Sequence, residues 1–196
     1  MKKKKVLSLS TDIKSLSYLI ENKGLENILF IDQVFSKEFN DNNNIIRIVK
    51  NENETKKTYD YCEKIFQIIS KHLYNILNQL HEINFSERSW RIIYGKWLKE
   101  FIYIVHKNYY LINEALNNYE VSEIITIDND YNLTTQDTLS FTKAQRDVDW
   151  NFSINSEIIK RFQISIKNIK IKSKSNFFND TRNYKNNFIY EKLTNL

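Results

Sequence analysis

The chain has 196 residues, of which 41% are hydrophobic and 14% aromatic, and its formal net charge is +5 at pH 7. This composition supports one packed domain rather than a disordered chain, and the single cysteine, Cys62, excludes a disulfide framework and a multi-cysteine zinc site. Proline is absent and lysine, asparagine and isoleucine are favoured, as an AT-rich coding sequence would produce. The lysine surplus is therefore weak evidence for nucleic-acid binding.

The N-terminal part alternates short apolar runs with polar breaks. Residues 5–10, 27–32 and 45–49 are predicted strands, and the apolar run that begins at Ile28 is typical of a parallel strand buried on both faces. A helix over residues 13–22 is expected to end at Gly24, because glycine readily takes the left-handed conformation of a helix end. The apolar run of residues 6–9 is too short for a signal peptide, and no run reaches transmembrane length, so we expect a cytoplasmic protein that could lie peripherally at the inner membrane face.

Two long helices are predicted over about residues 56–80 and 86–118, because apolar residues recur there at three- and four-residue spacings. The loop between them covers residues 81–85. The expected core-facing residues of the second helix are Trp90, Ile93, Trp97, Phe101 and Ile104. Gly95 costs about 1 kcal/mol relative to alanine inside this helix, so we expect another backbone to approach it closely.

The C-terminal part returns to the alternation of strands and helices. Residues 123–128 are a predicted strand, helical patterning continues to residue 164, and residues 167–172 have the pattern of an edge strand. This order predicts an α/β fold with a Rossmann-like parallel sheet flanked by helices, in one domain over residues 1–172. A loosely ordered tail is expected over residues 173–196.

The start of the second long helix carries side chains suited to binding an anion. Asn84 and Ser86 are competent N-caps, and Asn84 with Glu87 has the spacing of a capping box. Free backbone N–H groups and the positive end of the helix dipole favour phosphate or carboxylate. Arg88 and Arg91 share a helix face and could add bidentate contacts. The alternative is that both arginines are solvated or paired with a nearby glutamate.

Histidine and aspartate supply the other candidate groups. His81, beside the same helix start, could act as a general base or bind phosphate. Two D-x-D triplets, Asp128 with Asp130 and Asp147 with Asp149, could chelate Mg²⁺ or Mn²⁺ with a nucleotide-sugar donor, and no other cofactor is expected. Because such triplets arise often by chance, solvated turn residues are the simpler interpretation.

The run H-x-x-N-x-S-x-R-x-W-R-I-x-x-G-x-W-L at residues 81–98 resembles a signature of a transferase family from surface-polysaccharide (O-antigen) gene clusters. The matching residues are His81, Asn84, Ser86, Arg88, Trp90, Arg91, Ile92, Gly95, Trp97 and Leu98. The similarity extends over about residues 59–162. Phe85, Ser89 and Lys96 stand where the family tends to have histidine, tyrosine and proline.

The resemblance implies a two-domain glycosyltransferase of the GT-B type, of which this chain would be the N-terminal domain or a truncated form. Its partners would be a nucleotide-activated sugar or polysaccharide precursor, and a C-terminal half as a separate chain. Arg88 and Arg91 would hold an anionic ligand, and His81 would assist proton transfer. The alternatives are a non-catalytic remnant or subunit that needs the other half and, with less support, a basic nucleic-acid-binding module.

Overall fold

The structure is a computed structural model that describes residues 4–9, 21–31, 45–46, 52–127, 135, 137–161 and 166–171. The chain divides into two compact units, which are described separately. The first unit, here called the sheet unit, contains residues 1–46 and 114–196, and the second, the hairpin unit, contains residues 47–113. Residues 173–196, where a tail is predicted, lie outside the described residues.

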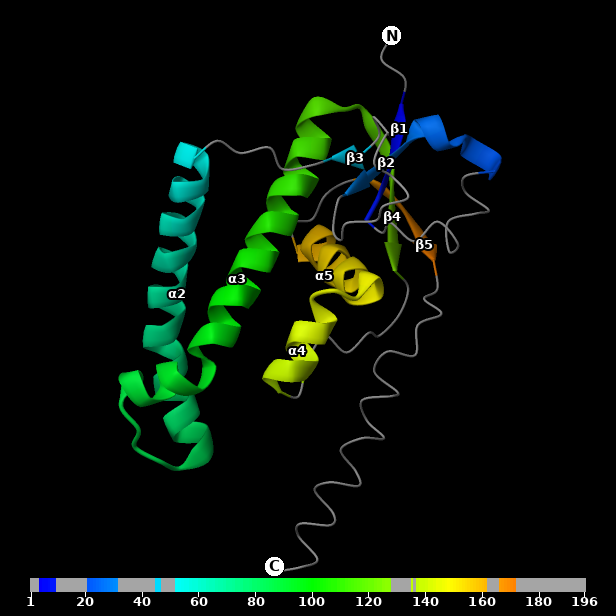
Figure 1. The fold of residues 1–196 in the computed structure, drawn as a ribbon. Coiled ribbons are helices and arrows are strands. Elements are labelled where there is room, and N and C mark those ends of the chain that lie inside the picture. Colours follow the sequence, from blue (N-terminus) through cyan, green and yellow to red (C-terminus); the bar gives the residue numbers. More distant parts are fainter. Residues whose placement is uncertain are drawn as a thin grey trace, which may run out of the picture. The chain divides into compact units, whose positions relative to one another are not determined.

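The sheet unit is built on five parallel strands (Figure 1). The strands are β1 (Lys5–Ser8), β2 (Ile28–Ile31), β3 (Ile45–Ile46), β4 (Val121–Ile127) and β5 (Lys167–Ile171). Their order across the sheet is β3-β2-β1-β4-β5, and each of the four pairings is parallel. The predicted α/β class and the parallel sheet are confirmed, and β5 lies at an edge as expected.

The central strands are buried because their side chains are apolar on both faces. All four residues of β2 are fully buried, and so is Leu7 in β1. Burying an aliphatic side chain contributes about 1.5–3 kcal/mol. These two strands therefore anchor the sheet.

Short helices of the sheet unit begin at aspartates. α4 (Thr138–Ala144) starts at a capping box formed by Asp137 and Ser140, and the Asp147 carboxylate accepts the Trp150 N–H at 2.7 Å to cap α5 (Val148–Arg161). The Trp150 ring is fully buried and meets Phe141 edge to face. At the other end of the chain, Gly24 has a φ of 78° after helical residues 21–23, which confirms its predicted place at a helix end.

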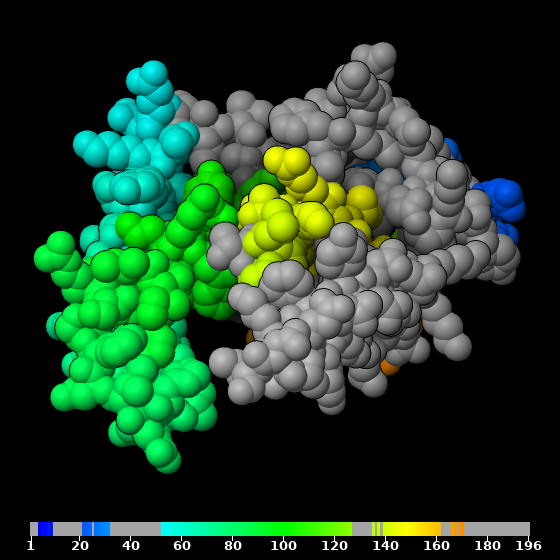
Figure 2. All heavy atoms as spheres, turned by 60° about the horizontal axis from the view of Figure 1, so that its bottom comes forward, coloured from blue at the N-terminus to red at the C-terminus, as the bar shows by residue number. Residues whose placement is uncertain are grey.

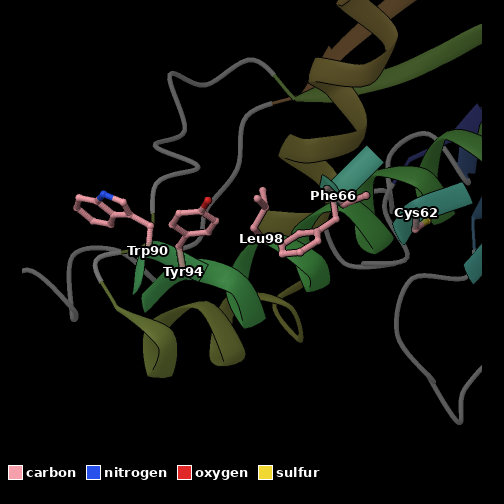
Figure 3. Packing of buried hydrophobic residues seen from close by; sticks show 6 residues of the cluster. Cys62, Phe66, Trp90, Tyr94 and Leu98 are labelled. Atoms are coloured by element: carbon pink, nitrogen blue, oxygen red, sulfur yellow. The ribbon is translucent and has the colours of Figure 1, made fainter. Parts of the chain in front are cut away.

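The hairpin unit consists of α2 (Glu52–His81) and most of α3 (Glu87–Asn118), joined by the short connection of residues 82–86. Both predicted long helices are confirmed to within a few residues. Their shared core is shown in Figure 3. Its members are Cys62, Phe66, Trp90, Tyr94, Leu98 and Ile102.

Two expectations about α3 are wrong. Ile93 is 61% exposed, because the residues that pack on α2 recur at every fourth position from Trp90 rather than along the expected stripe. Among the described residues, no backbone of another element approaches Gly95 closely. A Cβ there would lie 3.8 Å from the Phe66 ring, which is ordinary van der Waals contact.

Neither of the long helices, nor any other helix among the described residues, is both long and apolar enough to cross a bilayer.

Candidate functional site

The connection between α2 and α3 is fixed by backbone geometry at the end of α2. Glu82 has a φ of 54°, the left-handed conformation that ends many helices. The Ile83 N–H then donates to the Asn78 carbonyl at 3.1 Å, which satisfies one of the last carbonyls of α2. The chain is thereby turned towards the start of α3.

Asn78 holds this connection through three hydrogen bonds of one side chain. Its Oδ1 accepts the Trp90 indole N–H at 2.7 Å and the Phe85 backbone N–H at 3.0 Å. Its Nδ2 donates to the Phe85 carbonyl at 2.9 Å. One amide in the last turn of α2 thus fixes both the loop and the first turn of α3.

Trp90 is the centre of an aromatic cluster at the turn end of the hairpin. Its side chain is 6% exposed, and its ring centroid lies 5.7 Å from the centroids of both His81 and Phe85. His81 itself is exposed. The ring of this candidate base is therefore held on one side by Trp90 and is open to solvent.

Ser86 is the N-cap of α3. Its Oγ accepts the Ser89 N–H at 3.1 Å, and its carbonyl accepts the Trp90 N–H at 3.1 Å. The expected capping box of Asn84 and Glu87 does not form, because the Glu87 carboxylate pairs with Arg91 one turn later. Asn84 is exposed in the connection, where it makes no hydrogen bond within the described part of the chain.

The first turn of α3 retains unused donors. Within the described residues, no acceptor faces the backbone N–H of Glu87 or Arg88. The Arg88 guanidinium is exposed and likewise has no ion pair or hydrogen bond among them. The first turn of α3 thus carries two amides and an exposed cation without partners among the described residues, at the positive end of a 32-residue helix.

Arg91 is occupied by neighbours within the hairpin unit. Its guanidinium pairs with Glu87 at 2.6 Å, donates to Gln67, and lies 5.3 Å from the centroid of the Phe66 ring. Arg88 and Arg91 thus have different environments, although both belong to the same turn. Only Arg88 presents its full set of donors to an incoming anion.

The aspartate candidates belong to the sheet unit, whereas His81, Arg88 and Arg91 belong to the hairpin unit. Asp128 and Asp130 lie outside the described residues. Burial raises the pKa of Asp147, its carboxylate caps α5, and the nearby Asp149 adds to the rise. Asp149 lies in the first turn of α5, and the described residues contain no cluster of three or more potential metal ligands.

A protein-family model matches most of the chain. The model of the LIC12162 family transferase matches residues 18–196. The chain belongs to the LIC12162 family of transferases. No curated protein and no solved structure matches it. The LIC12162 family match spans both units, including the turn end of the hairpin and α5.

The structure adds residues that sequence reasoning had missed in this family member. Asn78 and Gln67 hold Trp90 and Arg91, but both lie on α2 among other polar residues and have no distinguishing local pattern. Their partners are 12 and 24 residues away in sequence. Only the packing of the two helices reveals these contacts.

Proposed function

We propose that this LIC12162 family member is the acceptor-side domain of a transferase that moves a sugar or related group during surface-polysaccharide synthesis. The start of α3 holds an anionic group of the substrate. The observation that carries this proposal is the set of unused donors at one helix end, namely the N–H groups of Glu87 and Arg88 and the Arg88 guanidinium. Charge-assisted hydrogen bonds from such donors favour phosphate strongly.

The proposed reaction forms one glycosidic bond and breaks one bond to a nucleotide diphosphate. The acceptor hydroxyl attacks the sugar carbon, the nucleotide diphosphate leaves, and His81 takes the hydroxyl proton. The position of His81 against Trp90, in the turn before the anion-binding amides, supports this role. Asn84 and Ser86 line the approach, with Ser86 also capping the helix. Arg91 pairs with Glu87 in the same turn of α3 as Arg88.

The sheet topology supports the Rossmann-like form of the proposal. Strand order β3-β2-β1-β4-β5 is that of the first five strands of doubly wound nucleotide-binding sheets. We propose that a second α/β domain supplies the donor half of the site, as in GT-B transferases. Asp128, Asp130 and Asp149 remain proposed contacts to Mg²⁺ or Mn²⁺ accompanying the nucleotide-sugar, and the protein works at the cytoplasmic face of the inner membrane.

Binding of a water-soluble polyprenyl phosphate analogue, measured by calorimetry, tests the anion site. Arg88→Ala is expected to weaken binding by about tenfold, since a hydrogen bond to a charged group contributes about 1.5–3 kcal/mol. Lys96→Ala is the matched control, because Lys96 is an exposed cation in the same helix. Equal affinities for wild type and Arg88→Ala, or no binding by wild type, would overturn the proposal.

A further inference from the structure

Large apolar side chains remain exposed on the turn half of the hairpin unit, here residues 64–96. The core between α2 and α3 takes one stripe of each helix and leaves other apolar residues outside it. Leu80 is 71% exposed, Ile93 61% and Ile76 56%. Folded proteins rarely gather such side chains in one exposed patch, and a patch of this kind commonly binds a partner or a membrane.

One hydrogen bond across the hairpin places two exposed isoleucines on the same edge of the helix pair. Arg91 of α3 donates to Gln67 of α2, so both of these side chains lie on one edge. Ile69 and Ile93 each lie two residues further along their helices, which is about 200° around an α-helix. Both isoleucines therefore lie on the opposite edge.

This second edge continues along α2 to the turn. Ile76 and Leu80 follow Ile69 at spacings of seven and four residues, which keeps all three on one face of the helix. We call Ile69, Ile76, Leu80 and Ile93 the apolar edge. It runs from the middle of α2 to the last turn of this helix, and it includes the second turn of α3.

Basic side chains lie beside the apolar edge on exposed faces of both helices. Ile68 and Ile92, the sequence neighbours of two residues of the edge, are themselves exposed. Lys64 lies one turn before Ile68, while Arg88 and Lys96 lie one turn before and one turn after Ile92. Long basic side chains can cover apolar neighbours with their stems and keep their charged ends in the polar region. The aliphatic surface is thus bordered by cations on α2 and on α3.

The turn half is also more basic than the rest of the hairpin unit. Residues 64–96 contain five lysines and arginines and two acidic residues, whereas residues 52–63 and 97–113 together contain four and five. One of the two acidic residues, Glu87, is paired with Arg91 at 2.6 Å. A lysine-rich composition would raise the charge of both parts alike. The asymmetry therefore belongs to this surface and points to an anionic partner.

We propose that the turn half of the hairpin unit docks on an anionic bilayer, with the apolar edge in the headgroup region and Lys64, Arg88 and Lys96 on lipid phosphates. Aliphatic residues bordered by lysine and arginine are typical of helices that lie in a membrane interface. Charge disfavours a second copy of the chain as the partner, because two surfaces of the same positive charge repel each other. That the bilayer is the inner membrane rests on the proposed function, whereas the surface itself does not.

Flotation of the full chain with phospholipid vesicles tests this surface. Wild type is expected to bind vesicles of phosphatidylcholine mixed with phosphatidylglycerol, to bind phosphatidylcholine alone far more weakly, and to dissociate at high salt. Leu80→Ser should weaken binding by about tenfold or more, because it removes apolar area that the bilayer would bury. Leu139→Ser is the matched control, since Leu139 is 65% exposed but belongs to the sheet unit.

A second pair of variants tests the charges. Lys64→Gln combined with Lys96→Gln should weaken binding to the mixed vesicles by more than about tenfold, since each basic residue near an anionic bilayer contributes about fivefold. Lys56→Gln combined with Lys57→Gln, at the other end of α2, should bind as wild type. Circular dichroism checks that each variant folds. If one does not, the dependence of wild-type binding on lipid charge and on salt still decides.

Three results would overturn the surface: no binding of wild type to vesicles, equal binding to neutral and mixed vesicles, or unchanged binding of folded Leu80→Ser. Self-association without lipid that Leu80→Ser abolishes, together with no vesicle binding, would assign the apolar edge to a second copy instead. The Lys64 and Lys96 double variant should still bind the water-soluble polyprenyl phosphate analogue. Vesicle binding without analogue binding would therefore reject only the anion site, and the reverse result would reject only the membrane surface.

Discussion

The turn end of the hairpin and the carboxyl edge of the sheet both contain polar groups without hydrogen-bond partners among the described residues. These groups are exposed at the hairpin and buried at the sheet. At the hairpin, Arg88 and the first amides of α3 are open to water, which satisfies them at little cost. At the sheet edge, Asn155 Oδ1 is enclosed and the missing donor is costly. An exposed unused donor can take an anion without rearrangement, whereas the enclosed acceptor of Asn155 has no access to solvent.

The two regions also differ in how their order is maintained. The turn end of the hairpin depends on a few named contacts around Trp90, and Figure 2 shows its outer surface in green. The sheet edge depends on strand pairing on both sides of β1. Single substitutions should therefore disturb the hairpin more than the sheet.

Trp90→Ala should give the largest effect. Removing this buried ring leaves a cavity against α2 and should destabilise the protein by about 3–5 kcal/mol. Ile92→Ala is the matched control, because Ile92 is 78% exposed and should change stability by less than about 0.5 kcal/mol. Urea unfolding measures the stability of both variants, with circular dichroism as a signal that does not depend on tryptophan. Similar losses for the two variants would contradict the packing described for α3.

Asn78→Leu should cost about 1–3 kcal/mol, because it leaves the Trp90 indole and the Phe85 N–H without their acceptor. Asn75→Leu is the control, since Asn75 is exposed and bonds only within its own helix. Hydrogen exchange of the Trp90 indole should accelerate in Asn78→Leu alone. An unchanged exchange rate would show that Asn78 does not hold the connection.

The sequence predicted the elements better than the roles of side chains within them. Helix and strand positions follow from local periodicity, so α2, α3 and the parallel strands were predictable. The sequence did not predict that Tyr94 rather than Ile93 enters the core, because both are apolar and only the path of α2 selects between them. The pairing of Arg91 with Gln67, across the hairpin, is likewise tertiary.

The sheet edge was less predictable than the hairpin. Asn155 belongs to a polar-rich helix whose sequence gives no reason to single it out. Its side chain donates to the carbonyl of Leu9, 146 residues away. The D-x-D spacing drew attention to Asp147, whereas the structure uses that carboxylate as a helix cap.

Two substitutions of Asp147 distinguish its role as a helix cap from the effect of its charge. Asp147→Ala should cost about 1 kcal/mol by removing the cap. Asp147→Asn keeps a capping oxygen. Burial raises the pKa of Asp147 in the folded state above its value in the unfolded state. The folded state therefore holds the proton more tightly, and the wild type loses stability as the pH rises from the unfolded-state pKa to the folded-state pKa.

Asp147→Asn lacks this loss. It should therefore be more stable than wild type at pH 7 and should lose that advantage at pH 3, where the wild-type carboxyl is protonated in both states. Thermal unfolding at the two pH values measures the difference. An advantage of the same size at both would contradict the burial effect.

Gly95→Ala should give the smallest effect, and it should raise stability. The added Cβ has room against Phe66, and alanine is favoured inside helices, so stability should rise by up to about 1 kcal/mol. Urea unfolding measures the change. A marked loss of stability would show that α2 and α3 approach each other more closely than described.

We expect the start of α3 to receive an anionic group of the acceptor substrate, and NMR titration of ¹⁵N-labelled protein with a water-soluble polyprenyl phosphate analogue measures this binding residue by residue. Saturable shifts of the Glu87 and Arg88 amides and of the Trp90 indole are expected, with an affinity about tenfold weaker in Arg88→Ala and unchanged in Lys96→Ala. Saturable binding that leaves those three signals unmoved would contradict it.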